Sequence, residues 1–88
     1  MNLLLREDVS LTATDDGSGV LLDERSGQYW QLNPSGFTTL RLLLDGRDEQ
    51  SVAATLVGES GDVSLGRAVL DVRELADQLV AADLVVRR

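Results

Sequence analysis

The stretch Val20–Gly36, VLLDERSGQYWQLNPSG, contains two strand-like runs, a turn between them and the start of a helix. Val20–Glu24 and Gln28–Leu32 are the strands, and the three residues that separate them have turn composition. The Asn-Pro pair at 33–34 is typical of a helix N-cap followed by the first helical residue. The stretch also holds the single Trp, Tyr and Pro of the chain. It therefore predicts a hairpin that leads directly into a helix.

The neighbouring sequence extends this hairpin on both sides. Val9–Thr14 alternates apolar and small polar residues, which predicts a first strand, and Asp15–Gly19 supplies a turn. The three strands form an antiparallel meander. Three helices are expected after it, and Leu84–Val86 is expected to be an extended tail that lies back on the body. The expected helices run from Pro34 to Asp45, from Asp48 (as the cap) to Gly58, and from about Ser64 to Ala82.

Length and composition restrict the possible functions. The 88 residues predict one α+β domain over positions 1–88, and the net charge of −7 disfavours nucleic acid as a partner. The chain has no His and no Cys, which removes the usual general base and the usual metal ligands. We expect no catalytic residue, metal or cofactor. Met1–Arg6 does not resemble a signal peptide and no segment has transmembrane length, so we expect a cytoplasmic protein without a membrane partner.

The strand Gln28–Leu32 is the candidate binding element. Trp30 shares a face with Leu32, and a core role is favoured for it over a ligand role, whereas Tyr29 and Gln31 face outward. As the last strand of the meander it has an outer edge without charge or proline until residue 34. Either an extended peptide adds there as a fourth strand, or the C-terminal run or a second copy of the chain covers it.

The segments VLLD at 20–23 and GQYWQLNPSG at 27–36, followed by three helices, resemble the PqqD-like family of peptide-recognition domains. The resemblance covers roughly Arg6 to Val86 and is nearest to the free-standing RiPP recognition elements of lasso-peptide biosynthesis. It implies a three-stranded antiparallel sheet packed on a three-helix winged-helix-like bundle, without catalysis.

The resemblance further implies that the chain binds the leader segment of a ribosomally made precursor peptide. The leader adds as a strand to the third strand and lies against the third helix, with apolar side chains in pockets. A separate cysteine peptidase then removes the leader, and a separate ATP-dependent cyclase closes the ring.

Carried onto this chain, the resemblance gives two walls of a peptide site. The strand wall consists of Gln28, Tyr29, Trp30, Gln31 and Leu32. The helix wall consists of Val69, Val72, Arg73, Ala76, Asp77 and Val80. Arg73 and Asp77 are one helical turn apart, so they either pair with each other or contact polar groups of the leader.

A winged-helix DNA-binding regulator is the alternative, because it has the same kinds of elements. Its recognition helix would be the third helix. That helix carries Arg67 and Arg73 but also Asp71, Glu74 and Asp77, which is a poor surface for phosphate. A small hydrolase or an enzyme subunit is disfavoured by the lack of His and Cys.

Overall fold

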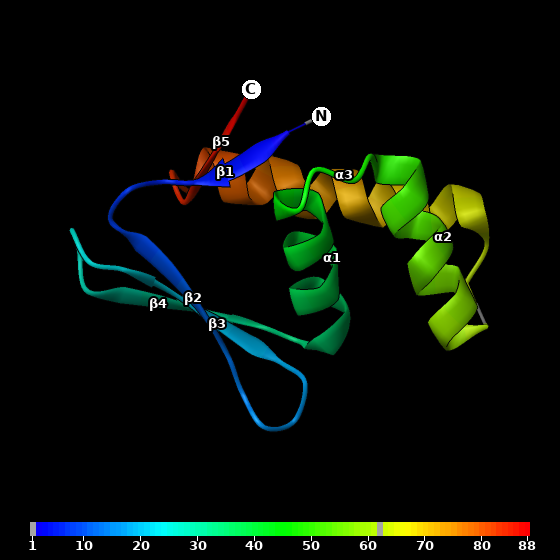
Figure 1. The fold of residues 1–88 in the computed structure, drawn as a ribbon, viewed down its shortest axis with the longest axis horizontal. Helices are drawn as coiled ribbons and strands as arrows, with labels where there is room; N and C mark the ends of the chain where they lie inside the picture. Colours follow the sequence, from blue (N-terminus) through cyan, green and yellow to red (C-terminus); the bar gives the residue numbers. More distant parts are fainter. Residues whose placement is uncertain (1, 62) are drawn as a thin grey trace.

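The computed structural model describes residues 2–61 and 63–88 and confirms the α+β architecture, with a three-stranded antiparallel sheet and three helices (Figure 1). The elements in chain order are β1 (Leu3–Leu5), β2 (Val9–Ala13), β3 (Gly19–Asp23), β4 (Gln28–Leu32), α1 (Pro34–Leu44), α2 (Glu49–Ser60), α3 (Leu65–Ala81) and β5 (Val85–Arg87). The strand predicted at 28–32 has the observed limits of β4.

The meander β2-β3-β4 buries one face against the helices. Leu21 at its centre lies opposite Leu11 on one side and Trp30 on the other, and it is fully buried. Phe37 of α1 packs so closely on β3 that a Cβ at Gly19 would overlap its ring. Glycine at this position therefore lets α1 lie directly on the sheet.

Side chains cap the start of each helix. The Asn33 Oδ1 accepts the Gly36 N–H at 2.8 Å, the Asp48 Oδ1 accepts the Ser51 N–H at 2.7 Å, and the Ser64 Oγ accepts the Arg67 N–H at 3.2 Å. The end predicted for the second helix at Gly58 is wrong. α2 continues to Ser60 and closes at Gly61, whose φ of 73° is the left-handed conformation that glycine adopts without strain.

The two ends of the chain form a second, two-stranded sheet that the sequence did not reveal. β1 pairs antiparallel with β5, with Leu3 opposite Arg87, and both termini lie together at the top of Figure 1. Leu3 and Val85 are buried in the common core. The C-terminal run therefore packs on the body as expected, but its partner is β1 and not the edge of β4.

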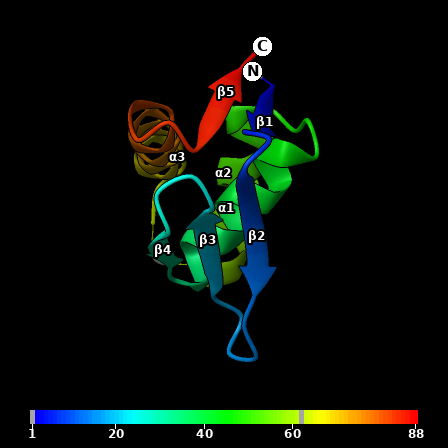
Figure 2. The same ribbon diagram turned by 90° about the vertical axis from the view of Figure 1, so that its left-hand side faces the viewer.

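The helices cover only part of the meander. Figure 2 shows β4 as the strand beneath α3, with β3 and β2 progressively farther from that helix. Figure 1 shows α1 between the meander and α2. In the described part of the chain, no helix is long and apolar enough to cross a membrane.

Candidate functional site

The outer edge of β4 has no strand beside it in the described chain, because β4 pairs only with β3. The alternation of hydrogen-bonded and non-hydrogen-bonded pairs in the sheet identifies which backbone groups of β4 are free. The Glu24 N–H donates to the Asp8 carbonyl, and the Thr14 N–H donates to the Ser18 carbonyl, each at 2.9 Å. Bonded pairs therefore join β2 to residues 20 and 22 of β3, and residues 19, 21 and 23 bond to β4.

It follows that the main-chain N–H and C=O groups of Tyr29 and Gln31 point away from β3. The register places Trp30 opposite Leu21 in a bonded pair, so its own main-chain groups are used within the sheet. The free edge thus offers two donors and two acceptors from alternate residues. This is the arrangement that an extended peptide needs in order to add as a strand.

The predicted core role of Trp30 requires a correction. Trp30 lies on the inner face as expected, opposite fully buried Leu21, but it is 39% exposed. The helices thus leave this part of the inner face partly uncovered, whereas Leu32, two residues nearer α1, is 7% exposed. Trp30 is therefore a partly exposed aromatic side chain on the inner side of the free edge of β4, which is the strand of the meander nearest α3 (Figure 2). Tyr29 faces outward as predicted and is 69% exposed.

The predicted helix wall also requires a correction of its orientation. Val72 and Ala76 are almost completely buried in the core, and Val69 and Val80 pack against it. The Arg73 guanidinium bonds to Glu49 at the start of α2. Asp77 pairs with Arg87 of β5. Arg73 and Asp77 therefore do not pair with each other; each joins α3 to a different neighbouring element. A peptide-binding role for these residues stays a prediction.

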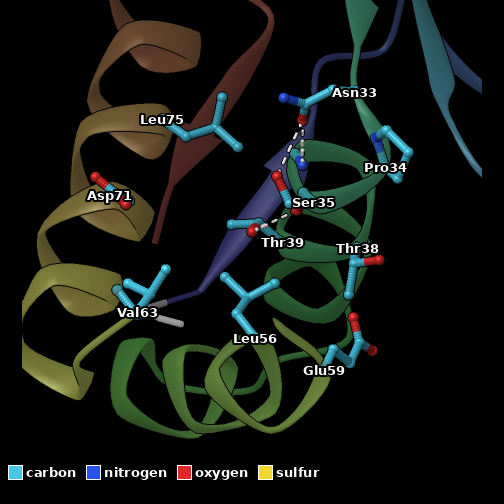
Figure 3. A pocket seen from close by; sticks show the side chains of 12 residues that line it. Asn33, Pro34, Ser35, Thr38, Thr39, Leu56, Glu59, Val63, Asp71 and Leu75 are labelled. Carbon is cyan, nitrogen blue, oxygen red and sulfur yellow. Dashed lines mark hydrogen bonds between the residues drawn. The ribbon is translucent and has the colours of Figure 1, made fainter. Parts of the chain in front are cut away.

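The side of α3 that faces the end of β4 carries Asp71 and Leu75, one turn apart. Both line a cavity of about 580 Å³ that begins at Asn33, directly after β4. Leu56 of α2 and Val63 contribute further apolar surface (Figure 3). The remaining lining is mostly polar and comes from the first turns of α1 (Pro34, Ser35, Gly36, Thr38 and Thr39), with Glu59 at the end of α2 and Ala68 on α3.

This cavity continues the line of the β4 edge. A chain lying along β4 past Leu32 reaches the first turn of α1, where the cavity opens. The described surface thus combines a free strand edge, an exposed Trp on its inner side and, at its end, a cavity with both apolar and polar lining. Extended peptides are bound by such combinations, in which the backbone gives affinity and the pockets give specificity.

The family described as coenzyme PQQ synthesis protein D (PqqD) matches residues 18–85. The chain belongs to the PqqD family. A lasso peptide synthetase B1, solved in complex with a leader peptide, is 33% identical with a TM-score of 0.86, covering 99% of this chain and 100% of the other. TbiB1, solved in complex with the TbiA(β) leader peptide, shares the fold at 23% identity with a TM-score of 0.82, covering 100% and 98%. No curated protein matches the chain significantly.

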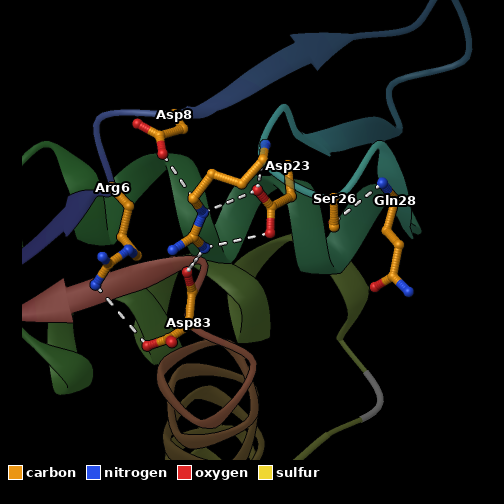
Figure 4. Close-up of polar contacts among 7 residues, drawn as sticks. Arg6, Asp8, Asp23, Ser26, Gln28 and Asp83 are labelled. Atoms are coloured by element: carbon orange, nitrogen blue, oxygen red, sulfur yellow. Dashed lines mark hydrogen bonds and ion pairs between the residues drawn. The ribbon is translucent and has the colours of Figure 1, made fainter.

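A polar cluster joins the sheet of this PqqD-family chain to the far end of α3. Arg25, in the turn between β3 and β4, donates from Nε and Nη2 to the two Asp23 oxygens at 3.1 and 3.2 Å. Its Nη2 also donates to the Asp83 carbonyl at 2.9 Å, and its Nε lies 3.5 Å from Asp8. Figure 4 shows Asp8, Asp23 and Asp83 converging from three segments.

The electrostatics of the cluster favour its charged forms. The hydrogen bond from Arg25 lowers the pKa of Asp23 from its ordinary value, against the opposing effect of burial. The same bond raises the pKa of Arg25. Asp23 is only 9% exposed, so its charge depends on this partner.

Sequence reasoning missed the cavity residues Asp71 and Leu75 and the cluster around Arg25. The spacing of Asp71 and Leu75 could have indicated the cavity residues. These two residues are four positions apart, so they share one flank of the apolar stripe of the third helix, and Arg73 lies on the other flank. No local pattern indicated that Arg25 connects the sheet to the end of α3, because Asp83, its partner there, lies 58 residues away.

Proposed function

We propose that this chain binds the leader segment of a ribosomally made precursor peptide, without catalysing a reaction itself. The leader adds as a fourth strand to the outer edge of β4. The observation that carries the proposal is the uncharged free edge of β4, with unpaired main-chain groups on Tyr29 and Gln31 and an exposed Trp30 beside it. Membership of the PqqD family, and a 33%-identical relative solved with a leader peptide, support it.

In the bound form, side chains of the added strand alternate between two sides of the sheet. Those on the inner side meet Trp30 and the side of α3 that carries Leu75. Those on the outer side meet Tyr29. Leader residues beyond Leu32 enter the 580 Å³ cavity with its apolar Leu56, Val63 and Leu75. Two or three buried apolar anchors together with the ladder bonds give a micromolar or tighter complex, roughly −8 kcal/mol or stronger.

The proposed role includes delivery. The bound precursor passes to a separate cysteine peptidase that removes the leader, and then to a cyclase that closes the ring. Because the precursor is made on ribosomes, we place the encounter in the cytoplasm. The chain supplies no His or Cys for either reaction, so the chemistry is assigned to these partners.

Titration tests the proposal directly. The probe is a synthetic leader segment of the precursor peptide encoded beside this gene, and a scrambled peptide of the same composition is the control. Trp30 is the only Trp, so its fluorescence reports on the β4 edge without labelling. Saturable binding of the leader and none of the scrambled peptide is expected. A lack of saturable leader binding contradicts the proposal.

Amide hydrogen exchange distinguishes strand addition from other modes of binding. The amides of Tyr29 and Gln31 have no ladder partner in the free chain and gain protection in the complex. The amide of Ala13, on the outer side of β2, is the matched control and stays unprotected. Binding without new protection at Tyr29 and Gln31 shows that the peptide does not extend the sheet.

The DNA-binding alternative is not favoured. On α3, the Arg67 side chain pairs with Asp71 at 3.3 Å and Arg73 pairs with Glu49, so both cations are already matched by acids. A helix without free cations on a chain of net charge −7 gives little attraction for phosphate. Retention of the chain on double-stranded DNA at moderate salt would reverse this ranking.

A further inference from the structure

Two walls bound the proposed peptide groove, and they touch each other very little. β4 belongs to the meander, whereas α3 packs on α1 and α2 and continues into β5. At one end of β4, Leu32 and Pro34 connect the strand directly to α1, which fixes the separation there. At the other end, near Gln28, the separation depends on what holds the β3–β4 turn in place.

Arg25 makes the connection at that end. It lies in the β3–β4 turn and donates across the molecule to the Asp83 carbonyl at 2.9 Å, in the turn that follows α3. Asp23 orients the guanidinium through two bonds, and Asp8 adds a third acidic contact from the segment between β1 and β2. Asp83 is itself constrained: its φ is 63°, and its carboxylate lies 3.8 Å from Arg6.

We propose that Arg25 is a positioning residue that sets the separation of β4 and α3, and thereby the width of the peptide groove. The role of this separation in peptide binding rests on the proposed function. The separation of β4 and α3 itself is a property of the free chain. A guanidinium suits this role because its planar fork satisfies the Asp23 carboxylate on one side and still reaches a carbonyl on the other.

The absence of cysteine from the sequence makes the separation measurable. Gln78→Cys introduces one thiol at an exposed position of α3, and an acceptor dye on it receives energy from the single Trp30 of β4. Energy transfer then reports the distance between the two walls. Affinity is measured separately, in chains without the dye, from the anisotropy of a fluorescein-labelled leader segment.

Three substitutions are compared in both assays. Arg25→Ala removes the connection, and Arg25→Lys keeps the charge but loses the fork. Arg41→Ala is the matched control, because Arg41 is exposed on α1 and its side chain makes no hydrogen bond or ion pair within the described residues. Far-UV circular dichroism confirms that each variant is folded at the temperature used. If Arg25→Ala does not fold, Arg25→Lys and Asp23→Asn replace it.

We expect Arg25→Ala to lower the energy transfer and to weaken leader binding by about ten-fold, with a smaller effect for Arg25→Lys and none for Arg41→Ala. Unchanged transfer in folded Arg25→Ala overturns the proposal, and a loss of affinity with unchanged transfer means that Arg25 contacts the peptide itself. Changed transfer with unchanged affinity refutes the link to groove width. Failure of the proposed function appears differently, as a wild-type chain that does not bind the leader, and the transfer measurement still decides the role of Arg25.

Discussion

The meander has two free edges in the described chain, β2 and β4, and they differ in what surrounds them. Both present main-chain groups of alternate residues, and neither edge strand carries a charge. β4 lies beneath α3 and ends at a cavity, whereas β2 lies on the far side of the sheet from that helix (Figure 2). A free edge alone is therefore an insufficient criterion for a peptide site. The second wall and the pockets distinguish the edge that binds.

The largest expected effect comes from a proline on the β4 edge, with a proline on the β2 edge as its comparison. Gln31→Pro removes a donor that points away from β3, so the sheet keeps its ladder while the added strand loses a bond and meets the pyrrolidine ring. We expect leader binding to weaken by about 100-fold or more, which is roughly 3 kcal/mol. Ala13→Pro makes the same change on the β2 edge and leaves the affinity within about two-fold.

Fluorescence anisotropy with the labelled leader measures both affinities, and thermal unfolding shows that both variants fold. Equal losses for the two variants would show that the edges are equivalent. A loss for Ala13→Pro alone would assign the peptide to β2.

The two faces of β4 supply the next comparison. Trp30→Leu removes aromatic surface from the inner side beneath α3 and is expected to weaken leader binding by about ten-fold, roughly 1.4 kcal/mol. Tyr29→Leu acts on the open outer side and is expected to cost about three-fold. The measurement is the same anisotropy titration. A larger effect at Tyr29 than at Trp30 would place the main anchors of the leader on the outer face.

A smaller effect is expected at the cavity. Leu75→Gln places an amide in the apolar lining and weakens binding by about five-fold, near 1 kcal/mol. Leu70→Gln is the matched control, because Leu70 is 56% exposed and does not line the cavity. Leu75 also packs against the core, so unfolding curves accompany the titration. Indistinguishable affinities of the two variants would exclude the cavity from the site.

Acid provides the smallest effect, with a defined sign. The pKa of Asp23 lies below its ordinary value of 3.8, so its stabilising charge is complete above that pH and is lost as the pH falls through the folded-state pKa. The Thr14 hydroxyl and the Ser18 backbone lower the pKa of Asp16 in the same direction, at the β2–β3 turn.

Both carboxylates therefore make unfolding easier below about pH 4. Of these two carboxylates only Asp23 contacts Arg25, so we expect acid to weaken leader binding through Asp23 and not through Asp16. Asp23→Asn should flatten the pH dependence of the affinity below about pH 4, and Asp16→Asn should not. If the affinity depended on pH in the same way in Asp16→Asn and Asp23→Asn, the polar cluster around Arg25 would have no role in binding.

The sequence was sufficient where structure depends on near neighbours. The limits of β4 follow from the turn before it and the Asn-Pro pair after it, and the cap at Ser64 locates the start of α3. Local patterns did not reveal β1, because three leucines carry no alternation and their partner β5 lies about 80 residues away.

The sequence of α3 also did not determine which side of the helix faces β4. The helix has an apolar stripe with polar flanks on both sides, and spacing alone does not say which flank faces β4. Arg73 and Asp77 lie on one flank, but their partners Glu49 and Arg87 lie on other elements. The exposure of Trp30 likewise depends on how much of the sheet the helices cover, which the local sequence does not determine.

The pairing of β1 with β5 brings the two chain ends to one point, where the Arg88 N–H donates to the Asn2 carbonyl at 2.9 Å. Figure 1 places this point away from the β4 edge. Adjacent ends suit a domain for insertion into a surface loop of a carrier protein or for circular permutation. A carrier protein could therefore be joined at both chain ends on one side of the domain, while the edge of β4 stays accessible on the other side.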